Sequence, residues 1–339
     1  MPDGSTNARV DELALRGAKT VPLTDLPVVD IGPLFGKDRQ AKESVASDID
    51  KACREVGFLY IKNHGISDEA TQAAFDEARR FFALSVEEKM KIHVKKVRTL
   101  TRGYVPMFEV HADKDAKPDF HEAFESALEV APDDPDHVAG NLLYGPNQWP
   151  SSLPGFRETV YGYYEALNRL GRILFTGFAI ALDLPEDYFE DKIGKPTAGF
   201  RLMHYPLQEN LDDAGIWGLG AHTDQECFTL LVQDSVSALQ LKTVQDQWVE
   251  ARPVADTIVV NIGDLMPRWT NDRYRSTAHR VLNPIAHARY SMGYFFGPDY
   301  DTPIACLPSC QDADHPPKYE PITAGEFCEA RVLSYHYET

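Results

Sequence analysis

Two histidines and one aspartate in this chain have the types and the spacing of metal ligands. His222 and Asp224 stand two residues apart in GAHTDQECFTLLVQD, a stretch that turns apolar immediately afterwards. Such a run is typical of a β-strand entering a core, where side chains two apart point to the same face. His279 lies in STAHRVLN, another strand-like run. Two imidazoles and one carboxylate form the facial triad of non-haem iron(II), but zinc hydrolases use the same residue types. The alternative for His222 and Asp224 is a buried polar pair without a metal.

A second pair of residues has the chemistry to bind a carboxylate beside the metal. Arg289 and Ser291 are two apart in RYSMGYFF and face one side of their strand. A guanidinium holds a carboxylate through two hydrogen bonds and keeps its charge when buried, which suits a ligand that chelates the metal with its other end. Tyr205, in FRLMHYP, could donate to the same ligand or fill the core. The alternative for Arg289 is an ion pair with an internal acid.

Gln225 and Glu226 follow directly after Asp224 and are candidates for substrate contacts. If the strand is regular, Glu226 shares the inward face of Asp224. A carboxylate buried close to a metal site requires a partner. We expect that partner to be an internal group, such as Arg201 or a backbone amide, with a polar substrate as the alternative.

These residues need a scaffold that the rest of the sequence predicts. Strands are expected at 27–31 and 58–61, and helices at 42–56, 68–83, 154–182 and 322–337. Residues 100–150, rich in Pro, Asp and Gly, are expected to form long loops over a site. From 199 to 296 short β-rich runs separated by turn residues predict an antiparallel barrel or sandwich. We expect a flexible arm at 1–20 and one domain at 21–339, with a mainly helical part (21–198), the metal-binding β core (199–300) and a C-terminal loop with a closing helix (301–339).

Composition limits the function classes. The net charge is −18, from 34 basic and 52 acidic residues, so phosphate backbones and anionic membranes would be repelled. The five cysteines are scattered and form no disulfide framework, and Cys306, Cys310 and His315 match no standard zinc spacing. The first residues lack the apolar core of a signal peptide. We expect a cytoplasmic monomer that binds a small molecule and neither nucleic acid nor membrane.

Several motifs together resemble a known family. The triad, its Arg-x-Ser partner and the segments PVVDIGPL, GFLYIKNHGI, HYP, VVNIGDLMPRWTNDRYRSTAHRV and RYSMGYFF are similar to the isopenicillin N synthase-like family of iron(II)/2-oxoglutarate-dependent dioxygenases, over about residues 21–335. The resemblance implies an α+β fold with a double-stranded β-helix (jelly-roll) core flanked by N-terminal and mid-chain helices. It also implies iron(II) ligation by His222, Asp224 and His279, and 2-oxoglutarate binding by Arg289, Ser291 and Tyr205. Met203 and Gln225 depart from the family, where asparagine and an aromatic residue are frequent.

The reaction that the resemblance implies consumes O2 and 2-oxoglutarate and releases succinate and CO2. The oxidised substrate would be a small-molecule metabolite that is hydroxylated, desaturated, cyclised or rearranged in a ring. The runner-up is an isopenicillin N synthase-type oxidase that uses no 2-oxoglutarate and binds a substrate carboxylate at Arg289 and Ser291. A zinc hydrolase and a non-catalytic binding protein are the more distant alternatives. For the substrate pocket we name Tyr104, Phe108 and Phe124 from the N-terminal half.

Overall fold

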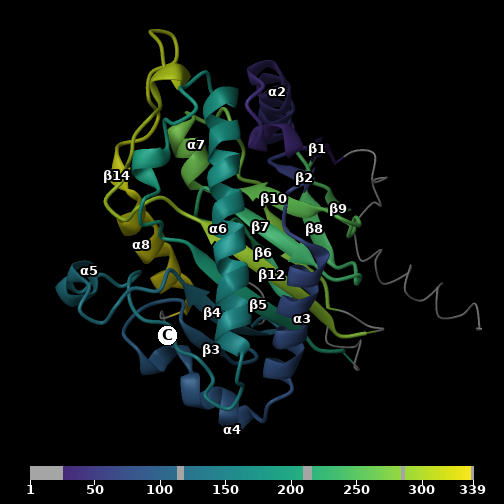
Figure 1. The fold of residues 1–339 in the computed structure, drawn as a ribbon. Helices are drawn as coiled ribbons and strands as arrows, with labels where there is room; N and C mark the ends of the chain where they lie inside the picture. Colours follow the sequence, from purple (N-terminus) through teal and green to yellow (C-terminus); the bar gives the residue numbers. More distant parts are fainter. Residues whose placement is uncertain (1–25, 113–117, 209–215, 284–286, 337–339) are drawn as a thin grey trace, which may run out of the picture.

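An eight-stranded sheet forms the centre of the molecule (Figure 1). The computed structural model describes residues 26–112, 118–208, 216–283 and 287–336, so the predicted arm at 1–20 lies outside the described residues. The strand order is β1-β2-β10-β7-β12-β5-β4-β3, and every neighbouring pair is antiparallel except β1 with β2. The strands are β1 Val28–Asp30, β2 Phe58–Lys62, β3 Gly103–Val105, β4 Glu122–Ala127, β5 Gly199–Tyr205, β7 Phe228–Gln233, β10 Ile258–Ile262 and β12 Arg289–Phe296.

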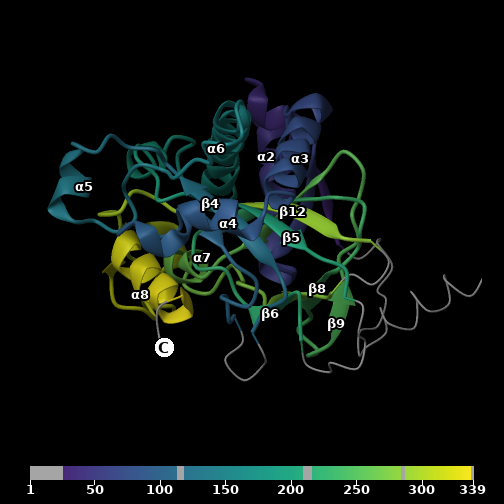
Figure 2. The same ribbon diagram turned by 90° about the horizontal axis from the view of Figure 1, so that it is seen from below.

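Three long helices cover one face of this sheet (Figures 1 and 2). They are α2 Arg39–Glu55, α3 Asp68–Phe82 and α6 Phe156–Ala181. The side chains of Asp38 and Ser67 accept hydrogen bonds from the first free amides of α2 and α3, which explains where these helices begin. The apolar face of α6 recurs every three or four residues and is buried against the sheet. The shorter helices are α4 Val86–Lys89, α5 Pro135–Ala139, α7 Leu265–Trp269 and α8 Ala324–His336, with 3-10 turns at Gly32–Phe35, Met90–Ile92, Val94–Lys96, Glu190–Lys192 and Pro308–Cys310.

A four-stranded sheet lies on the opposite side of the large sheet from the helices (Figure 2). Its order is β6-β11-β8-β9, with bounds β6 Leu219–His222, β11 His279–Val281, β8 Leu239–Lys242 and β9 Trp248–Glu250. Residues of the two sheets form a second core, separate from the one under the helices. Two facing, mainly antiparallel sheets make the predicted jelly-roll core. A pair of two-residue strands, β13 Pro303–Ile304 and β14 Ile322–Thr323, leads into α8.

The predicted elements are largely confirmed. The helices expected at 42–56, 68–83, 154–182 and 322–337 correspond to α2, α3, α6 and α8, and the β-rich runs from 199 to 296 correspond to β5 and β7–β12. Ser85 caps α4 by accepting a hydrogen bond from the backbone amide of Glu88. The expectation of long loops throughout 100–150 is wrong. That segment contributes α5 and also β3 and β4, and β4 is buried along its whole length between β3 and β5.

Candidate active site

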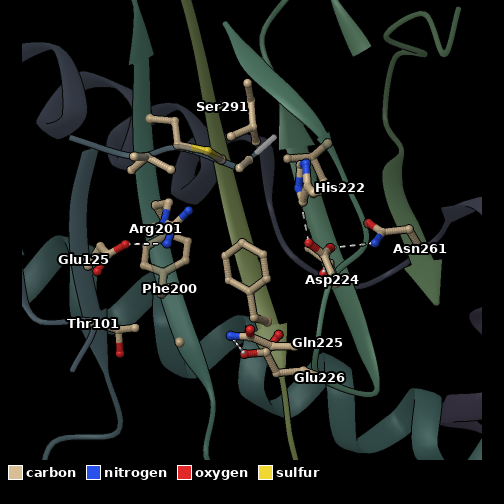
Figure 3. Close-up of a pocket in the computed structure, with 18 of the residues that line it drawn as sticks. Thr101, Glu125, Phe200, Arg201, His222, Asp224, Gln225, Glu226, Asn261 and Ser291 are labelled. Carbon is tan, nitrogen blue, oxygen red and sulfur yellow. Dashed lines mark hydrogen bonds and ion pairs between the residues drawn. The ribbon is translucent and has the colours of Figure 1, made fainter. Parts of the chain in front are cut away.

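The three predicted metal ligands meet between the two sheets. His222 ends β6 and His279 begins β11, and the two residues are direct partners in the β6–β11 pairing. The Oδ1 atom of Asp224 lies 3.6 Å from Nε2 of His222 and 3.7 Å from Nε2 of His279. Asp224 itself lies beyond the end of β6, in the loop to β7, and not on the strand as predicted. Figure 3 shows His222 and Asp224 directed toward each other at one side of the pocket.

Hydrogen bonds fix which atom of each imidazole faces the centre. Nδ1 of His222 lies 2.8 Å from the carbonyl of Gly220, and Nδ1 of His279 lies 3.1 Å from the carbonyl of Thr277. A carbonyl oxygen only accepts, so each Nδ1 carries the proton and donates it. Nε2 of both rings is thereby left as the free ligand atom, the usual arrangement of a metal-binding histidine.

The carboxylate of Asp224 is oriented in the same way. Its Oδ2 accepts hydrogen bonds from the amide of Asn261, at 2.6 Å, and from the hydroxyl of Thr229. Oδ1 is then directed at the two imidazoles. Within the described residues these three side chains are the one cluster of His, Cys, Asp and Glu able to hold a metal, with ligand atoms within 4.8 Å of one another. Two imidazole nitrogens and one carboxylate oxygen on one side of a centre fit an iron(II) ion with open positions.

Burial and neighbouring charges shift the pKa values of all three side chains. Burial opposes the ionisation of Asp224, but the two imidazoles and the Thr229 hydroxyl outweigh it and hold the pKa of Asp224 well below its usual range. Burial and the neighbouring His222 lower the pKa of His279 to about 4, so that this ring is neutral at physiological pH. Burial also disfavours the charged form of His222, but the Asp224 carboxylate outweighs it and raises the pKa of His222 above its ordinary value.

The loop that carries Asp224 is held by the turn after β10. The amide of Asp264 donates to the carbonyl of Asp224 at 2.8 Å, and the hydroxyl of Thr223 donates to the Asp264 carboxylate at 3.1 Å. Arg331 of α8 pairs with the same carboxylate. Gly263 is required for the close approach, since a Cβ there would lie 2.2 Å from the carbonyl oxygen of Glu226. Asp264 therefore ties the metal loop to the C-terminal helix.

Arg289 is a fully buried guanidinium at the other end of the cavity. Its side chain donates to Ser291 Oγ at 3.1 Å, to Gln233 Oε1 at 3.0 Å and to the carbonyl of Val236 at 3.3 Å. Its Cζ lies 4.9 Å from the centre of the Tyr205 ring. Among the described residues no carboxylate forms an ion pair with Arg289, so the predicted alternative of an internal acid partner is not what the structure shows. A buried cation with only neutral partners is a site for an anion.

One cavity of about 130 Å³ joins these groups. Three groups of side chains line it: the candidate metal ligands His222, Asp224 and His279; Arg289 with Ser291 and Tyr205; and the polar residues Glu125, Arg201, Gln225 and Glu226. Figure 3 shows Arg201 and Glu125 on one side of the pocket, His222 and Asp224 on the other, and Gln225 with Glu226 at its base. The predicted contacts Gln225 and Glu226 therefore do reach the cavity.

Glu226 has an internal partner, as expected, but it is Gln225 and not Arg201. Arg201 forms an ion pair with Glu125 at 2.5 Å instead. Oε1 of Glu226 accepts a hydrogen bond from the Gln225 amide at 3.2 Å, while Oε2 has no partner. Burial, together with the charge of Asp224, raises the pKa of Glu226 to about 7.

The three aromatic residues predicted to contact substrate do not line the cavity. Tyr104 turns toward the helices, where its hydroxyl donates to Glu122 at 2.7 Å. Phe124 is fully buried among aromatic side chains on the helix side of β4. Phe108 is half exposed and packs against Phe120. These expectations are therefore corrected: on β4 the neighbour of Phe124, Glu125, is the residue on the cavity face.

Comparisons with known proteins agree with this geometry. A family model described as the 2OG-Fe(II) oxygenase superfamily matches residues 196–298, and one described as the N-terminal part of the non-haem dioxygenase in morphine synthesis matches residues 26–152. A 2-oxoglutarate-Fe(II) type oxidoreductase, hxnY, of Emericella nidulans is 39% identical over 302 residues, covering 88% of this chain and 86% of the relative. The chain belongs to the 2-oxoglutarate-Fe(II) oxygenase family.

Solved structures of this oxygenase family show the same fold. A full-length Neurospora crassa protein in complex with alpha-KG superposes with a TM-score of 0.82 at 28% identity, covering 91% of this chain and 96% of that one. A putative 2OG-Fe(II) oxygenase from Caulobacter crescentus gives 0.80 at 30% identity, with 91% and 99% covered. The predicted family, jelly-roll fold and cofactors are confirmed: this oxygenase uses iron(II), 2-oxoglutarate and O2 to oxidise a small molecule. Among the described residues, no helix has the length and apolar character to cross a membrane.

Sequence reasoning missed the groups that hold the ligands in place. Thr229 and Asn261 contact Asp224 from β7 and β10, and each is a polar residue inside an otherwise apolar strand. That interruption is a usable signal, because an unpaired polar side chain is costly in a core. Glu125 and its ion pair with Arg201 had no comparable signal, since β4 was not predicted.

Proposed function

We propose that His222, Asp224 and His279 hold the iron(II) ion of this oxygenase, and that Arg289, with Ser291 and Tyr205, binds the far carboxylate of 2-oxoglutarate. The observation that carries the proposal is the pairing of a free ligand set with a buried guanidinium that lacks an acid partner, in one cavity. A dicarboxylate that reaches from the metal to Arg289 satisfies both. When bound, iron(II) supplies the oxidation chemistry, in which O2 and 2-oxoglutarate are consumed and succinate and CO2 are released.

The side chains of this oxygenase would prepare and protect that reaction. Asn261 and Thr229 keep Oδ1 of Asp224 directed at the metal position, and the backbone carbonyls of Gly220 and Thr277 keep both imidazoles in the binding tautomer. The buried walls exclude water from the oxidising centre and direct its reactivity to the bound substrate.

We also propose that the enzyme works as a single-domain, cytoplasmic monomer without nucleic-acid or membrane partners. Strands from residues 28 to 296 share one sheet, which supports one domain over about 21–339. The five free cysteines support a reducing compartment. The net charge of −18 opposes binding to polyanions.

Replacing Arg289 with lysine tests the assignment of the carboxylate site. Arg289→Lys keeps the charge but loses the two-pronged geometry, so 2-oxoglutarate should bind roughly ten- to a hundred-fold more weakly, as expected for one lost hydrogen bond to a charged group. Binding is measured by calorimetry with the Mn(II)-loaded protein, and turnover by succinate release. Arg280→Lys is the matched control, because Arg280 is also buried, between Trp217 and Trp248, but does not line the cavity.

Two outcomes would contradict this assignment. If Arg289→Lys bound 2-oxoglutarate like the unchanged enzyme but lost affinity for the primary substrate, the guanidinium would hold a substrate carboxylate, as in an oxidase. If Arg280→Lys weakened 2-oxoglutarate binding as much, the effect would be structural.

A further inference from the structure

We propose that Glu226 is the substrate-binding acceptor of this oxygenase and that it selects substrates carrying an N–H donor, whether a cationic guanidinium or ammonium group or a neutral ring amide. The proposal rests on the function proposed above, because it places the substrate in the same cavity. Its starting point is Oε2 of Glu226, a carboxylate oxygen without a partner on a residue that is only 8% exposed.

The position of Glu226 is built into the backbone. Its carbonyl accepts from the amide of Leu265 at 3.3 Å, and the amide of Cys227 donates to the carbonyl of Phe296 at 3.0 Å. The close approach of Gly263 closes the other side of this loop. These contacts hold the backbone of Glu226 beside the cavity. A buried anion in this state is destabilising unless a ligand supplies the missing donor.

The internal cation that could neutralise Glu226 is occupied. Arg201 is paired with Glu125 at 2.5 Å, and its guanidinium lies over the Phe295 ring at 5.5 Å. Arg201 and Glu125 are direct partners in the β4–β5 pairing, which fixes this ion pair on the sheet. We call Glu125, Arg201 and Glu226 the substrate wall; within it the ion pair of Arg201 is made with Glu125, and Arg201 acts on Glu226 only through longer-range attraction.

This wall lies apart from the carboxylate site but on the same strands. In the β5–β12 pairing Tyr205 is opposite Arg289, Met203 is opposite Ser291, and Arg201 is opposite Gly293. Arg201 is thus four residues from Tyr205, or about 13 Å along the strand. A dicarboxylate at Arg289 and a separate substrate at Glu226 can therefore bind together, with the metal-binding Asp224 two residues from Glu226. An anionic substrate would be repelled by the carboxylate of Glu226. A purely hydrocarbon substrate would leave Oε2 of Glu226 without a hydrogen-bond donor.

The test uses matched pairs of small metabolites with the Mn(II)- and 2-oxoglutarate-loaded enzyme, which binds without turnover. Each pair contains an N–H compound and its counterpart in which every N–H of the recognised group is replaced by N-methyl, with L-arginine-type cations in one arm and uracil-type ring amides in the other. Calorimetry should find binders only among compounds with N–H donors, and methylation of the donor should abolish binding. Glu226→Gln should weaken binding roughly ten- to a hundred-fold for a cationic binder and less for a neutral one, because the variant keeps an acceptor but loses the charge.

Separate measurements distinguish this proposal from a structural role and from the proposed function. Glu226→Gln should melt at the same or a higher temperature, since it removes an unpaired buried charge, and should keep normal Mn(II) and 2-oxoglutarate binding. Glu129→Gln, which removes a carboxylate outside the cavity, should leave substrate binding unchanged. A lowered melting temperature with unchanged ligand preference would overturn the proposal, as would a panel whose binders lack N–H donors or that contains no binder. If the unchanged enzyme bound neither Mn(II) nor 2-oxoglutarate, the proposed function itself would fail.

Discussion

Thr229 and Asn261 offer the sharpest test of how the metal site is organised, because both contact Asp224 without being ligands. Thr229→Val keeps the shape of the side chain and removes only the hydroxyl that donates to Oδ2 of Asp224. Thr229 and Asn261 are 3% and 2% exposed, so water does not replace a lost hydrogen bond. We therefore expect weaker metal binding in each single variant.

The expected loss of metal affinity depends on whether the hydrogen bond to Asp224 forms only in the metal-bound protein or also without metal. A hydrogen bond to a charged group contributes about 1.5–3 kcal/mol, which sets an upper limit of roughly ten- to a hundred-fold. The bond is present with and without metal, so only its orienting effect on Oδ1 enters the metal affinity. We expect about a tenfold loss for Thr229→Val or Asn261→Leu, the lower end for residues that support metal ligands. The double variant should lose more than the product of the two, because Oδ2 then has no donor and the carboxylate can rotate.

Mn(II) titration by calorimetry measures these affinities directly. Thr302→Val is the matched control, since the Thr302 hydroxyl donates to the carbonyl of Lys192, away from the cavity. If Thr229→Val and Asn261→Leu each bound Mn(II) as tightly as the unchanged enzyme, the backbone alone would position Asp224, and the orienting role of both side chains would be refuted.

Two further predictions concern the metal ligands and the buried acid under the sheet. His279→Ala should abolish Mn(II) binding and succinate release while the protein stays folded by circular dichroism, because the two cores are built by other residues; ordinary turnover in this variant would remove His279 from the ligand set. Glu122 accepts hydrogen bonds from Lys89, Tyr104 and His204. Burial opposes its charge, but these partners outweigh burial and lower the pKa of Glu122. Its stabilising contribution is therefore present above its unfolded pKa of about 4.3 and is lost as pH falls through the folded value. Glu122→Gln should therefore lower the urea midpoint at pH 7 and flatten its fall below about pH 4.3, and Lys89→Met/Glu122→Gln should recover part of the loss at pH 7; an unchanged acid slope would contradict this.

The sequence was sufficient to predict those parts of the fold that depend on local pattern. The helical period of 154–182 and the alternation of the later strands each follow from which residues a single element must bury. β4 was missed because its pattern is hidden: Glu122 and Glu125 are buried polar residues, one in the network with Lys89 and one paired with Arg201. Buried acids look like loop residues until their partners, which lie far along the chain, are known.

The residue types of the candidate site could be predicted from the sequence, but the side of each strand on which they lie could not. His222, Asp224 and His279 stand out because their types are rare in an apolar strand, yet their meeting depends on the pairing of β6 with β11, which no local pattern specifies. Phe124 was predicted to contact substrate because it is aromatic. Adjacent residues of a strand point to opposite faces, and on β4 it is Glu125 that lines the cavity. Arg201 was named as a possible partner of Glu226, but it pairs with Glu125 across the β4–β5 pairing, which no local pattern specifies.

The register of β5 against β12 links the two binding sites that we propose in the cavity. Alternate residues of β5 turn Arg201, Met203 and Tyr205 to the cavity, and alternate residues of β12 turn Arg289 and Ser291 to it. A shift of one residue in either strand would turn its whole set to the helix side, so the proposed 2-oxoglutarate site and the proposed substrate wall depend on the same register. Changes of side chain at the Arg201 level leave the Arg289 level intact. Under these two proposals, the β5–β12 pairing places both sites, while a side-chain change at Arg201 would alter substrate choice without touching the residues proposed to bind 2-oxoglutarate.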